Sequence, residues 1–195
     1  MSEILTIDTT TNVIQNERVE PLQLYDDSLP LLNEVMPEYK DALPNFAMNN
    51  LVKQLKLTMK LYGGIGLSAN QCGIRARVFI IGTDQFQIAC INPKVIKSSA
   101  DLQKDNEGCL SFPALYLKIA RPIWCDVGFY DESGQYKEMR LEGLTARCFL
   151  HELDHMNVVK FTSHVGPVSI QLAKQKQQKF IKKVIRQKKN NGIFV

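Results

Sequence analysis

His151, Glu152 and His155 are spaced as hydrolytic metal chemistry requires. They form a His-Glu-x-x-His pattern within residues 151–155. In a helix, side chains at i and i+4 lie on one face, so both imidazoles can reach the same ion. Glu152 does not have to bind that ion and can take a proton from a water that the ion activates. The pattern therefore predicts a metal site with its own base, carried on a helix.

Such a site needs a third protein ligand, and the sequence offers two candidates. No Asp or Glu follows Asp154, so a downstream ligand would have to be His164. The upstream candidate is Cys109, whose neighbour Gly108 lets the backbone approach another group. A single cysteine is also commonly a small buried hydrophobe, so spacing alone leaves the choice open.

Three motifs, in this order, resemble those of the peptide deformylases. They are Gly-Ile-Gly-Leu-Ser-Ala-Asn-Gln at 64–71, Glu-Gly-Cys-Leu-Ser at 107–111 and His-Glu-Leu-Asp-His at 151–155. The resemblance runs from the helix before Gly64 to the end of the basic C-terminal tail. The chain departs from the family at Ser68, where Ala is usual, and at Leu150, where Gln is usual. The first motif and the N-terminal arm are also similar to phage-encoded members, with bacterial and organellar origins left open.

The resemblance implies a reaction and a metal centre. The reaction is removal of the formyl group from the N-terminal formyl-methionine of nascent peptides, by attack of a metal-bound water. Cys109, His151 and His155 are implied to hold one divalent ion, with Fe(II) in vivo and Zn, Ni or Co as alternatives in a purified form. Glu152 is implied to be the acid/base that takes the proton of the water and passes it to the leaving amine.

The resemblance also implies which residues contact the peptide. The side-chain amide of Gln71 and the backbone N–H of Leu110 would stabilise the oxyanion of the tetrahedral intermediate. An extended substrate would pair with the backbone at 65–66 by strand addition. The implied substrate-binding residues are Ile65, Gly66, Gly108, Arg121, Leu144 and Cys148. Glu107 and Arg147 lie near this pocket, and we interpret them as a structural ion pair.

The glycines at 63–66 do not form a nucleotide-binding loop. A dinucleotide fingerprint follows a strand and opens a helix. Here an amphipathic pattern over 46–62 comes before the glycines, and an apolar strand at 77–82 comes after them. The order of elements therefore argues against nucleotide binding.

Helical and strand patterns predict an α+β fold. We expect helices over 46–62, 144–158 and 168–189, and strands at 77–82, 86–92, 123–130 and 136–141, with a hairpin turn at Ser133-Gly134. These elements predict antiparallel sheets packed around a central metal-binding helix, with a C-terminal helix. We divide the chain into an irregular N-terminal arm (1–20), a catalytic metallohydrolase domain (21–170) and a basic C-terminal helix and tail (171–195).

Composition favours a cytoplasmic protein without a membrane span. The 195 residues are 45% hydrophobic and 23% charged, which is ordinary for a globular domain. No run of 18 apolar residues occurs, and the N-terminus carries Glu3 and Asp8 instead of a basic signal region. Five cysteines without a Cys-x-x-Cys pair indicate a reducing compartment, the host cytoplasm if the protein is phage-encoded.

Positive charge is concentrated at the C-terminal end. Nine Lys or Arg residues and no acidic residue follow His155. An apolar stripe formed by Phe180, Ile181, Val184 and Ile185 predicts either a solvated helix docked on the body or a basic helix that contacts a polyanion. A basic amphipathic helix can also meet a membrane surface. Because the implied substrate is a nascent chain, we hypothesise that this helix contacts the ribosome.

Two rival functions remain at this point. One is a general zinc endopeptidase that uses His164 as its third ligand. The other is a ribosome- or RNA-binding protein whose metal is purely structural, which predicts a closed site with four protein ligands. Glu152 and Gln71 count against the second rival, because a structural site needs neither.

Overall fold

The computed structural model describes residues 19–83 and 85–190, so most of the expected irregular arm (1–20) lies outside the described residues. The helices are α1 (Phe46–Leu61), α2 (Gly143–Met156) and α3 (Pro167–Asn190). The strands are β1 (Gly66–Ser68), β2 (Val78–Thr83), β3 (Phe86–Ser98), β4 (Leu102–Cys109), β5 (Phe112–Pro122), β6 (Trp124–Tyr130) and β7 (Tyr136–Glu142). Three short 3-10 helices cover Pro30–Asn33, Ala69–Cys72 and Phe161–His164.

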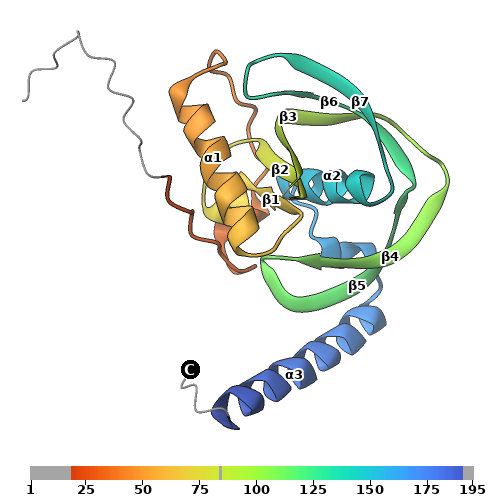
Figure 1. Ribbon diagram of the computed structural model, residues 1–195. Coiled ribbons are helices and arrows are strands. Elements are labelled where there is room, and N and C mark those ends of the chain that lie inside the picture. The colour runs from red at the N-terminus through yellow and green to blue at the C-terminus, as the bar shows by residue number, and fades with distance from the viewer. Residues whose placement is uncertain (1–18, 84, 191–195) are drawn as a thin grey trace, which may run out of the picture.

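The strands form two antiparallel sheets around α2. Five strands pair in the order β1-β2-β3-β6-β7, and β4 pairs with β5 in a separate sheet. Figure 1 shows α2 enclosed between the curved five-stranded sheet and the β4–β5 pair, with α1 on the outer side of β1 and β2. This arrangement confirms the α+β fold with a central helix and a C-terminal helix.

The alternation of side chains along β2 explains why the sheet has a helix on each face. Successive strand residues point to opposite faces. Phe79 and Ile81 join the core cluster that contains Phe149 of α2. Val78 and Ile80 join the cluster formed with α1. These four side chains are all buried, so this part of β2 is a continuous apolar run and does not alternate between apolar and polar residues.

The ends of helix α1 are capped, and its C-terminal cap positions the segment that leads into β1. Asn45 caps its N-terminus by accepting a hydrogen bond from the backbone N–H of Met48 at 2.8 Å. Its buried face consists of Met48, Val52, Leu55, Thr58 and Met59. At the C-terminus, Gly63 has φ of 65° and the backbone N–H of Gly64 donates to the carbonyl of Met59 at 2.9 Å, which is a Schellman ending. The helix end therefore leads directly into the Gly64–Gly66 segment beside α2.

Three strands that matter for the site, β1, β4 and β5, were missing from the expected elements. Strand β1, Gly66–Ser68, is too short to show an alternating pattern. In β4, Leu102–Cys109, most side chains are exposed and polar, so no apolar alternation marks it as a strand. In β5, Phe112–Pro122, alternate residues from 115 to 121 are buried, which is a period-two signal that could have been recognised. Strand β3 also continues six residues past the expected end, to Ser98.

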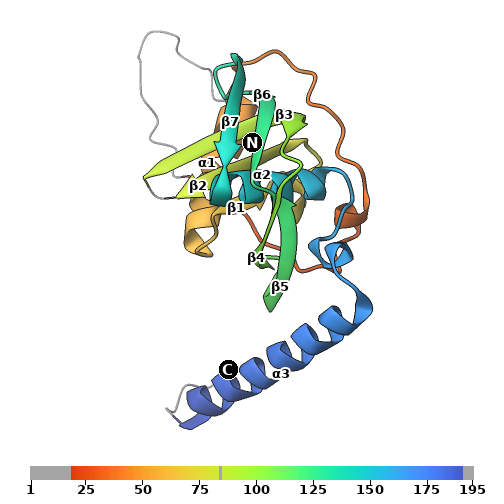
Figure 2. The same ribbon diagram turned by 90° about the vertical axis from the view of Figure 1, so that its right-hand side faces the viewer.

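Helix α3 packs on the body only through its N-terminal half. Ala173 packs against the apolar cluster of β5, and Gln177 Nε2 donates to the carbonyl of Pro113 at 2.6 Å. Beyond this point the helix extends away from the β4–β5 sheet, as both views show (Figures 1 and 2). Among the described residues, no helix has the length and apolar character needed to cross a membrane.

Candidate metal centre

Cys109, His151 and His155 bring three metal-ligating atoms together. Their ligand atoms all lie within 4.8 Å of one another, and Cys109 Sγ lies 3.3 Å from His155 Nε2. All three side chains are almost completely buried. Within the described part of the chain, no fourth His, Cys, Asp or Glu joins this group, and His164 stands apart from it. One ion held here would therefore keep an open coordination position.

Two local features bring a sulfur and two imidazoles to one point. The two histidines occupy one face of α2, at i and i+4. Cys109 is the last residue of β4, where the β4–β5 register shifts between Gly108 and Cys109. The extra residues of this shift, 113–115, lie on β5, so Cys109 stands beside the turn that joins the two strands. Cys109 then packs in a cluster with β5 and Phe161, which fixes the sulfur against α2.

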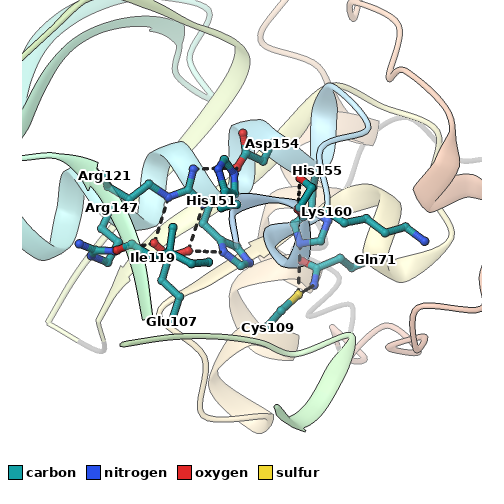
Figure 3. A network of polar contacts seen from close by, with 12 residues as sticks. Gln71, Glu107, Cys109, Ile119, Arg121, Arg147, His151, Asp154, His155 and Lys160 are labelled. Atoms are coloured by element: carbon teal, nitrogen blue, oxygen red, sulfur yellow. Dashed lines mark hydrogen bonds and ion pairs between the residues drawn. The ribbon is translucent and has the colours of Figure 1, made fainter. Parts of the chain in front are cut away.

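Glu107 anchors the ligand His151 from behind. Glu107 Oε2 lies 3.2 Å from His151 Nδ1, which leaves Nε2 of that imidazole for an ion (Figure 3). Arg121 binds both carboxylate oxygens of Glu107, with N···O distances of 2.9 and 3.0 Å. Arg147 Nη1 donates to Glu107 Oε1 at 2.7 Å, so the expected Glu107–Arg147 ion pair is present. The pair is thus one part of a network that orients a ligand.

The electrostatics of the pocket favour a positive charge on the His151 imidazole. Burial is the largest influence on the pKa of His151 and by itself would lower it. Hydrogen bonds with Cys109 and Glu107 outweigh burial and raise the pKa to about 10. In contrast, burial lowers the pKa of His155 to about 3, so that imidazole is neutral. Burial by itself would raise the pKa of Glu107, yet hydrogen bonds from His151 and Arg121 lower it to about 2. A cation bound to the imidazole can take the place of the proton that Cys109 and Glu107 stabilise.

Glu152 lies beside the three ligand atoms without being one of them. Its Oε2 is buried and has no hydrogen-bond partner within the protein. Burial is the main cause that raises the pKa of Glu152 to about 7, while the charge of His151 and a hydrogen bond with Ser68 lower it. Gly66 makes room for this carboxylate, because a Cβ at that position would overlap Oε1 of Glu152. The orphaned oxygen and the thiolate–imidazole donor set fit a divalent ion such as Fe(II), Zn, Ni or Co.

Gln71 approaches the site from the opposite side to Glu107. It belongs to the 3-10 helix that follows β1 and is almost fully buried. Its Nε2 lies 3.5 Å from Cys109 Sγ and 3.1 Å from Ser111 Oγ. In Figure 3, Gln71 and Cys109 lie together near His155. An amide N–H group therefore points into the metal centre.

A cavity of about 650 Å³ opens onto these groups. Its lining includes five of the six residues implied to bind substrate: Ile65, Gly66, Gly108, Leu144 and Cys148. It also includes Gln71, Leu110 and Glu152, together with the ligands Cys109 and His151. The outer wall comes from two segments that the sequence did not indicate, Leu24–Asp26 and Phe112–Tyr116.

Arg121 is the implied substrate contact that the structure does not bring to this cavity. Its side chain is buried, and it binds Glu107 on one side and Asp154 Oδ2 on the other, at 2.7 Å. His164 Nε2 also lies 2.7 Å from the same Asp154 oxygen. His164 therefore belongs to the outer end of the network and is not a neighbour of the ligand atoms. Asp154 follows His151 at i+3 on α2, so helical spacing alone could have suggested that it belongs to the network around the site.

A protein-family model described as polypeptide deformylase matches residues 21–171. The chain belongs to the peptide deformylase family. It is 36% identical over 165 residues to a peptide deformylase of Prochlorococcus marinus (strain NATL2A), which covers 82% of this chain and 79% of the relative. It is 32% identical over 163 residues to a peptide deformylase of Thermotoga sp. (strain RQ2), with coverages of 84% and 88%.

Solved deformylases share the fold of this chain. The crystal structure of a Synechococcus elongatus deformylase in complex with actinonin aligns with a TM-score of 0.76 at 31% identity, covering 81% of this chain and 88% of that one. A Legionella pneumophila deformylase gives the same TM-score at 28% identity, covering 85% and 98%. The resemblance inferred from the three motifs is confirmed. As a deformylase, the protein is a metal-dependent hydrolase that removes the formyl group from nascent peptides.

Proposed function

We propose that this deformylase uses Cys109, His151 and His155 as its metal ligands and Glu152 as its acid/base. The observation that carries the proposal is the convergence of the three ligand atoms next to a buried carboxylate with an unpartnered oxygen. The same carboxylate lines the substrate cavity. A general base must lie within reach of the proton that it takes, and this placement supplies that reach.

A bound divalent ion supplies Lewis acidity and lowers the pKa of water at the site. We propose Fe(II) as the native ion, as membership of the deformylase family implies. The mixed thiolate and imidazole set also suits Zn, Ni and Co as substitutes. Glu107 holds His151 so that Nε2 faces the ion. We assign Arg121 to the same positioning role, since both ends of its guanidinium are bound to carboxylates of the network.

Proton transfer and stabilisation of the oxyanion fall to different groups of the site. Glu152 accepts a proton from the attacking water and later delivers it to the leaving amine, so the carboxylate is regenerated in each cycle. The Nε2–H of Gln71 and the backbone N–H of Leu110 donate to the oxygen that gains charge as the water attacks the formyl carbon. One such donor typically contributes about 3 kcal/mol of barrier reduction.

We propose that the peptide lies along β1 and places its methionine in the cavity. Ile65 and Gly66 would offer backbone groups to the extended substrate, because β1 is an edge strand of the five-stranded sheet. Ile65, Leu144 and Cys148 would contact the methionine side chain. Gly108 would let the substrate come close to the β4 backbone, although one face of Gly108 is already covered by the ring of Tyr116.

Two variants test these assignments together. Glu152→Gln should keep the metal and lose about 10²- to 10⁴-fold in turnover, because only proton transfer is removed. Cys109→Ala should lose the metal. Both are measured by metal analysis after anaerobic purification and by formate release from formyl-Met-Ala-Ser. Retention of both metal and activity in Cys109→Ala would refute the proposed ligand set.

The position of His164 in the structure argues against the alternative function as a general zinc endopeptidase. That function required His164 as a ligand, whereas His164 bonds Asp154 and stands outside the cluster of ligand atoms. Formylated and unformylated peptides tested side by side distinguish the two activities. Formate release without cleavage of internal peptide bonds is the expected result.

We further propose that α3 contacts ribosomal RNA. Its outward half carries lysines and an arginine that make no ion pair among the described residues, and the substrate is a nascent chain. A polyanion would bind such a helix by releasing counterions. This function and the five free cysteines are the support for placing the enzyme in the cytoplasm, with residues 21–170 as its catalytic unit.

A further inference from the structure

Ser68 is a buried polar residue to which the mechanism above gives no role. It ends β1 and begins the 3-10 helix that carries Gln71. Its exposed fraction is 0%. A hydroxyl in such a place must find partners within the protein, because burying it without a hydrogen bond is costly.

At this end of the 3-10 helix Ser68 forms hydrogen bonds with Gln71, and its hydroxyl also interacts with the Glu152 carboxylate. The backbone N–H of Ser68 donates to Gln71 Oε1 at 3.0 Å. The Ser68 hydroxyl donates to the same oxygen at 2.9 Å. In return, the hydroxyl oxygen accepts a bond from the backbone N–H of Gln71, which completes a capping box.

These bonds decide which end of the Gln71 amide faces the metal centre. With Oε1 bound to two donors, Nε2 is directed to Cys109 Sγ and Ser111 Oγ. A rotation of the amide by 180° would bring its NH₂ group against the Ser68 backbone N–H. It would also replace the N–H that points into the site by an oxygen. Buried donors facing donors are strongly disfavoured.

We propose that Ser68 is a positioning residue that holds the Gln71 amide with its N–H directed into the metal site. The inference rests on the proposed role of Gln71 as oxyanion donor and adds the group that fixes its orientation. Ser68 itself does not touch the substrate. Its hydroxyl supplies the second of two bonds to Oε1, and the backbone supplies the first.

Ser68→Ala removes one of the two bonds to Oε1, together with the capping bond from the Gln71 backbone N–H, and creates no steric conflict. Losing one buried hydrogen bond shifts the equilibrium between the two amide orientations by about five- to tenfold and weakens the restraint on the amide. We expect kcat to fall, by at most that factor, while KM for formyl-Met-Ala-Ser stays unchanged, because Gln71 acts on charge that develops during the reaction. Metal content should match the parent enzyme, and the melting temperature should fall by about 2–4 °C, the usual effect of losing one helix cap. Ser133→Ala, which removes a hydroxyl from an exposed turn, is the matched control and should leave kcat unchanged.

A double-mutant cycle with Gln71→Ala identifies the route by which Ser68 acts. If Ser68 works through the Gln71 amide, Ser68→Ala has no further effect on kcat once Gln71 is Ala. An equal loss in both backgrounds overturns the proposal, and so does an unchanged kcat in the single variant Ser68→Ala. If Gln71→Ala itself keeps full activity, the oxyanion role fails as well. The single variant Gln71→Ala therefore separates failure of the proposed function from failure of this inference.

Discussion

Glu107 and His151 are joined by a contact of 3.2 Å between a carboxylate oxygen and Nδ1 of the imidazole. The two residues are 44 positions apart, on β4 and α2. Glu107 also accepts bonds from the buried Arg121 and Arg147. The carboxylate therefore fixes the orientation of a metal ligand and forms ion pairs with two buried guanidinium groups at once.

Glu107→Gln should weaken metal binding by about 10- to 100-fold, the usual effect of removing a group that orients a metal-bound histidine. It should also destabilise the fold by about 3–5 kcal/mol, because the buried guanidinium of Arg147 loses its carboxylate partner and that of Arg121 keeps only Asp154. Competition with a chelator measures the first effect, and thermal unfolding of the metal-free protein measures the second. Glu138→Gln, at an exposed site on β7, is the control. Unchanged metal affinity in Glu107→Gln would contradict the orienting role.

Gly66→Ala should disable the acid/base while sparing the metal ligands. A Cβ at this position would overlap Glu152 Oε1 and lie 2.7 Å from Cys148 Sγ. Displacing the base should lower kcat by about 10²-fold or more. Formate release together with metal analysis checks this expectation. Gly166→Ala has no atom within 4 Å of the new Cβ and should behave as the parent enzyme. Full activity in Gly66→Ala would show that the carboxylate can move without loss.

Phe149→Ala should be among the most destabilising single changes in α2. The Phe149 ring is fully buried and meets Phe79 edge-on, with ring centroids 5.1 Å apart. Truncating a buried phenylalanine typically costs about 3–5 kcal/mol of unfolding free energy. Denaturant unfolding of both the metal-loaded and metal-free forms measures the loss. Phe86→Ala removes an aromatic ring that is 62% exposed and should cost far less. Similar losses for both variants would contradict the assignment of this core.

Ribosome binding by α3 should depend on charges in its outward half. Changing Lys182, Lys183 and Arg186 to Gln should weaken co-sedimentation with ribosomes at low salt and flatten its salt dependence. The control triple Lys40, Lys104 and Lys118 to Gln removes the same charge from exposed positions on the body. Equal binding by the two triple variants would reject the hypothesis. Deleting residues 172–195 is a less specific test, since Ala173 and Gln177 support the segment that lines the cavity.

The local elements were predictable where one short-range signal dominates. The helix expected over 46–62 is α1, Phe46–Leu61, because its apolar spacing and its terminal glycines agree. The helix expected over 144–158 is α2, Gly143–Met156, for the same reason. Strand β4 was missed since its residues are polar on both faces, and it is held by pairing with β5 instead of by burial.

By itself, the sequence determined the chemical types at the site and their local spacing. The i, i+4 histidines, the intervening Glu152 and the ordered motifs were sufficient to indicate the family and its reaction. Tertiary structure decided which distant groups complete that site. It placed Cys109 beside the imidazoles and His164 away from them, and it placed Arg121 behind Glu107 and Ser68 against Gln71. The physical reason is that strand register, the irregularity in β5 opposite Cys109 and the packing of both strands on α2 set these contacts, and a local sequence pattern determines none of them.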